Sequence, residues 1–294
     1  MLFFVSLLVD GLLAGPLYAL IALAFVVVYK TSRMVNFALG EWAMLGSRLV
    51  AAGLYAMGLG LAGAIGLACA ATVAGALVFN RLVLRRMVGG PMVSVIMVTL
   101  GLGMLMRGAV PLVLGGTPSA IPLPFPSDPF SAWGVMVSTE KLVTASTATV
   151  CVAVVSWFFR RSRTGLALRA MADDQQVATA VGIDIHRHLS IAWAMMATIS
   201  VLAGTLWTVV AGGGFGVVLV GLKVFPIVIV GGLDSIPGSI VAALVIGVLE
   251  GLAAGYLDPF VGGGFSSVAS YLVLIAMLFV RPHGMLGRPH VERI

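Results

Sequence analysis

Residues 1–29, "MLFFVSLLVDGLLAGPLYALIALAFVVVY", decide the fold class, and Asp10 is the one charged side chain among them. About 20 apolar residues in a helix cross the roughly 30 Å hydrocarbon core of a bilayer, and this run is longer than that. It lacks the basic start of a secretory signal and exceeds the length of a signal's apolar core. The stretch therefore predicts a retained membrane span.

The apolar character continues along the chain, which has 294 residues, 10% of them charged, and a mean hydropathy of +1.12. Backbone groups in lipid must be paired inside helices or closed barrels, and the alternating segments of barrel strands are absent. The sequence predicts an all-α, polytopic transmembrane helix bundle in a single domain, residues 1–294, with eight or nine spans. The predicted spans are residues 3–29, 35–56, 58–80, 93–114, 140–159, 189–211, 220–233, 238–256 and 266–280. A broken or re-entrant helix is the alternative for 220–233, because this segment is short for a full crossing.

The placement of basic residues predicts the orientation. One set of loops and tails, which includes the 160–188 loop and the C-terminus, holds 13 of the 17 Lys and Arg residues. Cytoplasmic loops carry the excess of basic residues, so we expect these segments to be cytoplasmic. Topology then explains the net charge of +6 without a nucleic-acid partner. The proline-rich residues 115–134 are predicted to form a stiff loop on the external side.

Two polar breaks interrupt the apolar pattern, within residues 26–47 and 226–247. Transporters place substrate sites beside such broken helices, and ionisable groups at membrane depth usually face the bundle interior or a cavity. In the first break, Asn36 and Glu41 therefore have two interpretations, as lining of a solute pathway or as helix packing. Two further candidates for the solute pathway are Arg48, on the same helical face as Glu41, and Asp234, in the second break.

The other polar residues in the spans suggest no chemistry. Arg107 and Lys223 lie toward the outer ends of their spans and are expected to extend toward the interface. Glu250 is deep in a span, and the sequence does not indicate its partner. Cys69 and Cys151 are expected to be packing residues, and no spacing typical of metal ligands occurs. The chain also lacks His-Glu-x-x-His and Gly-x-Ser-x-Gly, which disfavours an intramembrane enzyme.

The 160–188 loop is the one long loop on the predicted cytoplasmic side. Gly165 and Gly182 bracket a segment of helix-forming composition, and Asp173 followed by Gln176 resembles a capping box that would start a second short helix. Such short helices are unstable alone in water and need a partner surface. Their expected apolar side comprises Leu166, Ala170, Val177 and Val181.

An alternative is that this loop is a basic segment lying on an anionic lipid surface. The acidic residues Asp173, Asp174 and Asp184 disfavour it, because anionic lipids would repel them.

Four stretches in order resemble bacterial branched-chain amino acid ABC permeases of the LivH type. They are "GLLAGPLYALIALAFVVVYKTSRMVNFALGEWAML" (11–45), the loop "RTGLALRAMADDQQVATAVGIDIHR" (163–187), "GLKVFPIVIVGGLDSIPGSIVAALVIGVLEG" (221–251) and "RPHGMLG" (281–287). The resemblance implies an ABC importer permease fold in the bacterial inner membrane. Its solutes would be branched-chain amino acids, although similar permeases carry urea, short amides or aromatic acids.

The resemblance also implies partners. These would be a homologous LivM-type permease subunit, two cytoplasmic ATPase subunits and a periplasmic solute-binding protein. The chain itself would bind no cofactor, and ATP would bind to the ATPase subunits, since Gly-x4-Gly-Lys-Ser/Thr is absent here. The expected contact with the ATPase comprises Gly165, Arg169, Asp173, Gly182, Ile183 and Asp184.

The sequence departs from the family pattern at two positions. Leu39 replaces the histidine usual in "NFALGE" (36–41), and Arg48 stands where an aromatic residue is common. Both lie in the stretch expected to meet solute. A stand-alone secondary transporter or channel is the competing interpretation, but it would need its own ion site or filter, and the spans offer few carboxylates.

Overall fold

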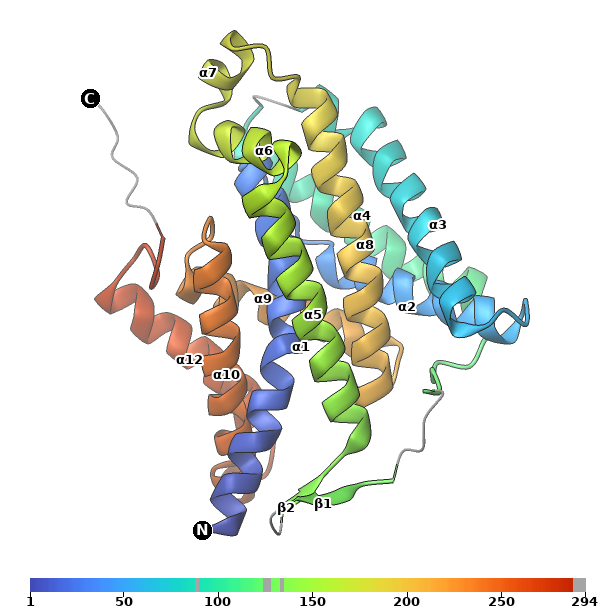
Figure 1. Cartoon of the computed structure of the whole chain (residues 1–294), viewed down its shortest axis with the longest axis vertical. Helices are drawn as coiled ribbons and strands as arrows, with labels where there is room; N and C mark the ends of the chain where they lie inside the picture. The colour runs from blue at the N-terminus through green and yellow to red at the C-terminus, as the bar shows by residue number, and fades with distance from the viewer. Residues whose placement is uncertain (88–89, 124–127, 133–134, 288–294) are drawn as a thin grey trace. The chain divides into compact units, whose positions relative to one another are not determined.

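The computed structural model describes the chain apart from residues 88–89, 124–127, 133–134 and 288–294 (Figure 1). Helices dominate the described residues, and one short hairpin joins α4 to α5. The helices are α1 (Leu2–Ser32), α2 (Leu39–Tyr55), α3 (Leu61–Leu82), η1 (Leu84–Arg86), α4 (Met92–Leu114), α5 (Thr139–Arg161), α6 (Arg163–Asp173), α7 (Gln175–Ala180), α8 (Ile185–Ala211), α9 (Phe215–Gly231), α10 (Ile236–Tyr256), α11 (Asp258–Val261) and α12 (Phe265–Val280).

Every predicted apolar segment is helical, which confirms the all-α polytopic fold. Within the described residues, six helices are long and apolar enough to cross a membrane, fewer than the eight or nine expected. They are α1, α3 with η1, α4, α5, α8 and α10. The difference lies in α2, α9 and α12, which have 17, 17 and 16 residues. At a rise of 1.5 Å per residue each is about 24–26 Å long, shorter than the hydrocarbon core.

A β-hairpin was not predicted. Strands β1 (Phe130–Ala132) and β2 (Val135–Val137) pair antiparallel, with Phe130 opposite Val137. Residues 115–134 were expected to be a loop throughout, but β1 lies within that range. Residues 133–134 and the proline-rich residues 124–127 lie outside the described part of the chain. The strands contain Phe130, Val135 and Val137, which are residue types enriched in β-strands.

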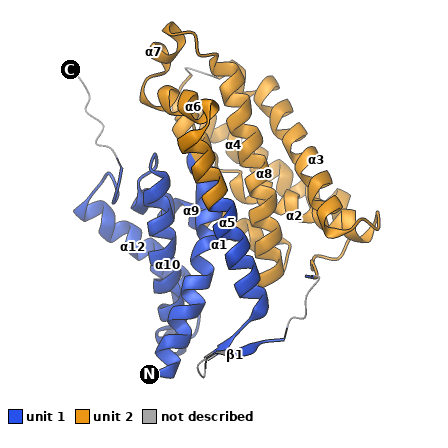
Figure 2. Cartoon of the chain, in the orientation of Figure 1, with its two compact units in different colours: residues 1–26, 123–152, 223–294 blue, residues 27–122, 153–222 orange. Residues whose placement is uncertain are grey.

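The chain packs as two compact units (Figure 2). Unit 1 comprises residues 1–26, 123–152 and 223–294, and unit 2 comprises residues 27–122 and 153–222. Helices α1, α5 and α9 contribute residues to both. The single domain over residues 1–294 stays a prediction.

Small residues bring helices close together inside each unit. In unit 2, Gly204 of α8 lies against α2 so closely that an added methyl group would overlap the Ala43 carbonyl. In unit 1, a Cβ on Gly11 of α1 would lie 2.6 Å from the carbonyl oxygen of Gly247 in α10. Such contacts stabilise helix pairs in lipid, where helix association gains little from the hydrophobic effect. They explain much of the chain's glycine content.

Candidate functional site

The first polar break is the linker 33–38 between α1 and α2, in unit 2. Asn36 is buried there, and its Oδ1 accepts a hydrogen bond from the Ala38 backbone N–H at 3.0 Å. Its Nδ2 lies 4.0 Å from the Met196 sulfur of α8. The Phe37 backbone N–H donates to Thr99 Oγ1 of α4 at 3.3 Å. Asn36 and Phe37 thus hold the linker to the helices around it.

Glu41 lies in the first turn of α2 and is 1% exposed. Arg107 Nε of α4 donates to Glu41 Oε1 at 2.5 Å, so the two form an ion pair within unit 2. Gly103, one turn before Arg107, makes room for the carboxylate, because a Cβ there would lie 3.3 Å from Glu41 Cδ. The expectation that Arg107 extends toward the interface was wrong. Desolvation of Glu41 makes an ion pair the more favourable arrangement.

The remaining predicted pathway residues have different surroundings. Leu39 is buried at the start of α2. Arg48, half-buried, does not pair with Glu41, because its Nη1 donates to Thr117 O and Ser119 Oγ, each at 3.0 Å. Asp234, half-buried in the turn between α9 and α10, belongs to unit 1, whereas the others belong to unit 2.

Unit 1 contains a second buried ion pair that the sequence did not indicate. Lys223 Nζ of α9 lies 3.0 Å from Glu250 Oε2 of α10, and Tyr18 of α1 donates to the same oxygen at 2.5 Å. Lys223 was expected to extend toward the interface, which was wrong. These residues are separated by up to 232 positions, so no local pattern could reveal the cluster. The one usable signal was the presence of opposite charges in two spans.

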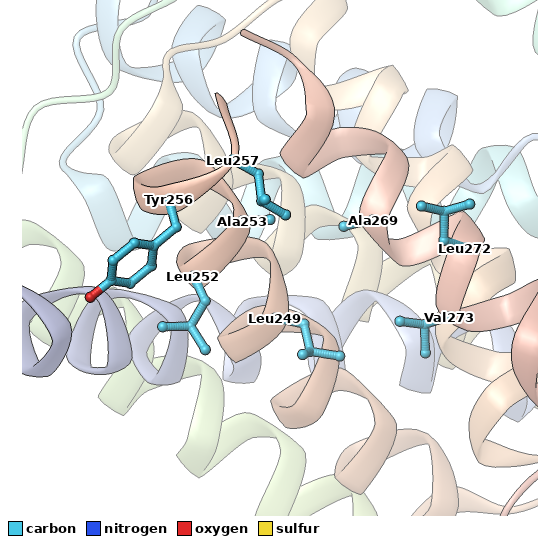
Figure 3. A pocket seen from close by; sticks show the side chains of 8 residues that line it. All are labelled: Leu249, Leu252, Ala253, Tyr256, Leu257, Ala269, Leu272 and Val273. Atoms are coloured by element: carbon cyan, nitrogen blue, oxygen red, sulfur yellow. The ribbon is translucent and has the colours of Figure 1, made fainter. Parts of the chain in front are cut away.

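Two cavities adjoin this region of unit 1. One, of about 270 Å³, is lined by residues that include Glu250, Asp10 and Lys141. Lys141 Nζ pairs with Asp10 at 3.0 Å. The other, of about 440 Å³, lies between α10 and α12 (Figure 3). Its lining is apolar apart from Tyr256, whose hydroxyl points away from the other labelled side chains, so it offers no polar recognition of a solute.

The 160–188 loop forms the two predicted helices, and each begins at a side-chain cap. Ser162 Oγ accepts from the Gly165 N–H at 2.8 Å and caps α6. Asp174 caps α7 by accepting from the Gln176 and Val177 N–H groups at 2.7 and 3.0 Å. Asp173 was predicted to be this cap, but it is the last residue of α6. The cap is one residue later because Asp174, with φ −156° and ψ 116°, is the extended residue between the helices.

The turn that follows α7 requires glycine. Gly182 has a φ of +89°, its N–H donates to Thr179 O, and the Ile183 N–H donates to Ala178 O, so the turn terminates α7. Asp184 then caps α8 by accepting from the Arg187 N–H at 3.1 Å. This hydrogen bond lowers the pKa of Asp184 below its ordinary value. Three of the six residues predicted for coupling, Gly182, Ile183 and Asp184, are therefore residues that shape this turn.

Two other predicted coupling residues face the body of unit 2. Gly165 is buried against α5, where a Cβ would lie 2.5 Å from the Phe159 carbonyl oxygen. Arg169 is half-buried and donates from Nη2 to Arg160 O at 3.3 Å. The exposed residues of the segment include three large apolar side chains, since Leu166, Val177 and Val181 are 61%, 60% and 72% exposed.

Comparison with known proteins identifies the family. Residues 7–281 match the model of the branched-chain amino acid transport system permease component. The chain belongs to this family. It is 30% identical to the branched-chain amino acid permease LivH of Escherichia coli K12, over 100% of this chain and 98% of that protein. It is 32% identical to BraD of Pseudomonas aeruginosa, over 98% and 97% of the two chains. The family resemblance of the four motifs is confirmed, and the chain is a multi-pass membrane permease.

Proposed function

We propose that this permease carries branched-chain amino acids across the bacterial inner membrane as one subunit of an ATP-binding cassette importer. The observation that supports it most is the end-to-end match to permeases named for high-affinity branched-chain amino acid transport. The proposed complex contains a LivM-type permease subunit, two ATPase subunits and a periplasmic binding protein. ATP would bind to the ATPase subunits, and this chain would bind no cofactor.

The proposed surface for the ATPase is formed by α6 and α7 on the cytoplasmic side. The exposed Leu166, Val177 and Val181 support this proposal, because large apolar groups on short capped helices are typical of an interface. The buried Gly165 and the half-buried Arg169 would hold the helices in place for that contact.

The proposed solute pathway runs beside the first break. Glu41 and Arg107 would contribute charge to it, with Asn36, Leu39 and Arg48 setting its shape. Support comes from the depth of the Glu41 carboxylate, since buried ionisable groups in membrane helices are costly to keep. Asp234 would act at the second break, between α9 and α10.

The test is uptake by the full complex in proteoliposomes, with labelled leucine, ATP inside and loaded binding protein outside. ATP-dependent uptake is expected, and excess isoleucine and valine should compete with it. Competition by urea, short amides or aromatic acids in their place would overturn the solute assignment. Leakage of leucine without ATP or binding protein would indicate a channel.

A matched pair of variants tests the ATPase surface. Val177→Glu places a charge at an exposed apolar position of α7, and Thr179→Glu places the same charge at an exposed polar position of that helix. Val177→Glu should abolish copurification of the ATPase subunits, while Thr179→Glu should leave most of it. Equal copurification in both variants would contradict the proposed surface. A cysteine introduced at Thr179 should not react with a membrane-impermeant thiol reagent in intact cells, because the loop is expected on the cytoplasmic side. It should react once the cells are permeabilised.

A further inference from the structure

The end of α1 carries an arginine in a backbone conformation that arginine rarely adopts. Arg33 has a φ of +56° and is the one non-glycine residue with positive φ among the described residues. Its N–H still donates to Tyr29 O, so it occupies the position after a helix where glycine is usual. A left-handed residue with a side chain costs about 1–2 kcal/mol. The contacts of this side chain explain why glycine is absent here.

The Arg33 side chain reaches the end of α6. Its Nη2 donates to the Ala172 carbonyl oxygen at 2.9 Å, and its guanidinium lies 5.9 Å from the centre of the Tyr29 ring. Ala172 is in the last turn of α6, where carbonyl groups lack partners within the helix. A cation that accompanies these carbonyls also interacts favourably with the helix dipole. Arg33 thus ties the end of α6 to the end of α1.

A second bond crosses the same junction. Gln175 Nε2, at the start of α7, donates to the Thr31 carbonyl oxygen of α1 at 3.4 Å. The two bonds lie on either side of Asp174, the extended residue between α6 and α7. All of these residues belong to unit 2. The junction of the helix pair is therefore held to the end of α1 from both sides.

The far end of the linker is also fixed. Asn36 is bonded to the Ala38 N–H, and the Phe37 N–H is bonded to Thr99 of α4. Asn36 is three positions after Arg33, and this stretch spans at most about 11 Å when fully extended. Because both ends are bonded and the linker is short, a displacement of Ala172 beyond the reach of the Arg33 side chain must move the linker or break the Arg33 bond.

We propose that Arg33 is a positioning residue that connects movement of the α6–α7 pair to the linker that carries Asn36. The inference rests on the proposed function, in which α6 and α7 contact the ATPase. Arg33 does not meet solute or ATP in this scheme. Arg33 transmits displacement of the ATPase-facing helices to Asn36 and to the start of α2. Helix α2 begins at Leu39, two residues before Glu41.

Two substitutions separate this role from a purely structural one. Arg33→Asn removes the guanidinium and keeps a residue that tolerates the left-handed conformation, so the fold should be as stable as before or more stable. Arg33→Lys keeps the charge and one donor. Arg81→Ala removes another exposed arginine, in the last turn of α3 and outside the proposed ATPase surface, and serves as the control.

The main measurement is leucine uptake per ATP hydrolysed by the reconstituted complex. We expect Arg33→Asn to lower this ratio about three- to tenfold with normal copurification and thermal stability, and Arg33→Lys to restore part of it. The control should match the unmodified protein. An unchanged ratio in Arg33→Asn would overturn the proposal, and so would a loss that merely parallels lower stability or copurification.

Hydrogen exchange of the purified permease provides a readout independent of transport. Backbone amides of Phe37 and Ala38 should exchange faster in Arg33→Asn than in the control, because the linker loses its bond to α6. If the unmodified complex shows no ATP-dependent uptake, the proposed function fails while the exchange result still decides whether Arg33 holds the linker. Unchanged exchange at both amides would reject that role.

Discussion

Removal of Glu41 and removal of Arg107 should lower the stability of the protein by different amounts. Glu41 is 1% exposed, whereas the Arg107 side chain is 39% exposed. Arg107→Met leaves a carboxylate in the interior without the guanidinium that compensates it. Glu41→Gln leaves a partly exposed arginine side chain, whose guanidinium still faces an amide oxygen of similar size. The arginine substitution should therefore be the more damaging one.

The expected magnitudes follow from these exposures. Loss of one partner of a fully buried ion pair typically costs about 3–5 kcal/mol. Because Arg107 is partly exposed, we place Arg107→Met at the lower end, about 3 kcal/mol. Glu41→Gln exchanges a charged hydrogen bond for a neutral one, which costs about 1 kcal/mol. The double variant leaves no buried charge at the site, so it should be more stable than Arg107→Met alone.

Reversible unfolding in mixed detergent micelles can measure all four proteins as a double-mutant cycle. An interaction free energy of about 1–2 kcal/mol is expected, with the sign that favours the intact pair. Equal, additive losses would refute the argument that the Glu41 charge is compensated by Arg107. Glu41→Gln should also lower leucine uptake while assembly remains normal. Unchanged uptake would leave Glu41 with a packing role.

Four further substitutions test local features of the fold. Asp174→Ala should lower the stability of α7 by about 1 kcal/mol and speed the exchange of its backbone amides. Asp173→Ala should have a much smaller effect on both. Gly182→Val should lower the thermal midpoint, because its φ of +89° strains a β-branched residue. Hydrogen bonds from the Ser266 N–H and hydroxyl lower the pKa of Asp258. These bonds therefore stabilise the folded protein above the ordinary carboxyl pKa, and this stabilisation is lost as the pH falls through the pKa that Asp258 has in the folded protein. Ser266→Ala should raise that pKa in an NMR titration and shift local acid unfolding to higher pH.

Local patterns predicted the helices well, because each signal lies within a few residues of the structure it specifies. The apolar segments from 3–29 to 266–280 all became helices. The turn at Gly182 is similarly local, since few other residues adopt its conformation without strain. The cap of α7 was predicted at Asp173, one residue before the observed cap at Asp174. Two adjacent aspartates fit the same sequence pattern, and the backbone conformation selects between them.

Charge pairing could not be predicted, because the partners come from distant helices. Arg107 and Lys223 were expected to extend toward the interface on the basis of their position near helix ends. Each instead lies beside a carboxylate from another helix, Glu41 or Glu250. Sequence position gives depth in the membrane, but it does not give the face that a residue presents to its neighbours.

The two buried pairs impose a comparable constraint on each unit. A slide of α4 along α2, or of α9 along α10, by one helical turn would move a charge by about 5.4 Å and leave a carboxylate unpaired in the interior. A continuous range of positions is therefore unfavourable, and each helix pair is restricted to arrangements that retain its ion pair. In unit 2 the linker between α1 and α2 shares this constraint, since Glu41 lies near its end and Arg33 lies at its start. Movement that begins at α6 would then reach a site that favours discrete positions, which is the property that coupling to a distant event requires.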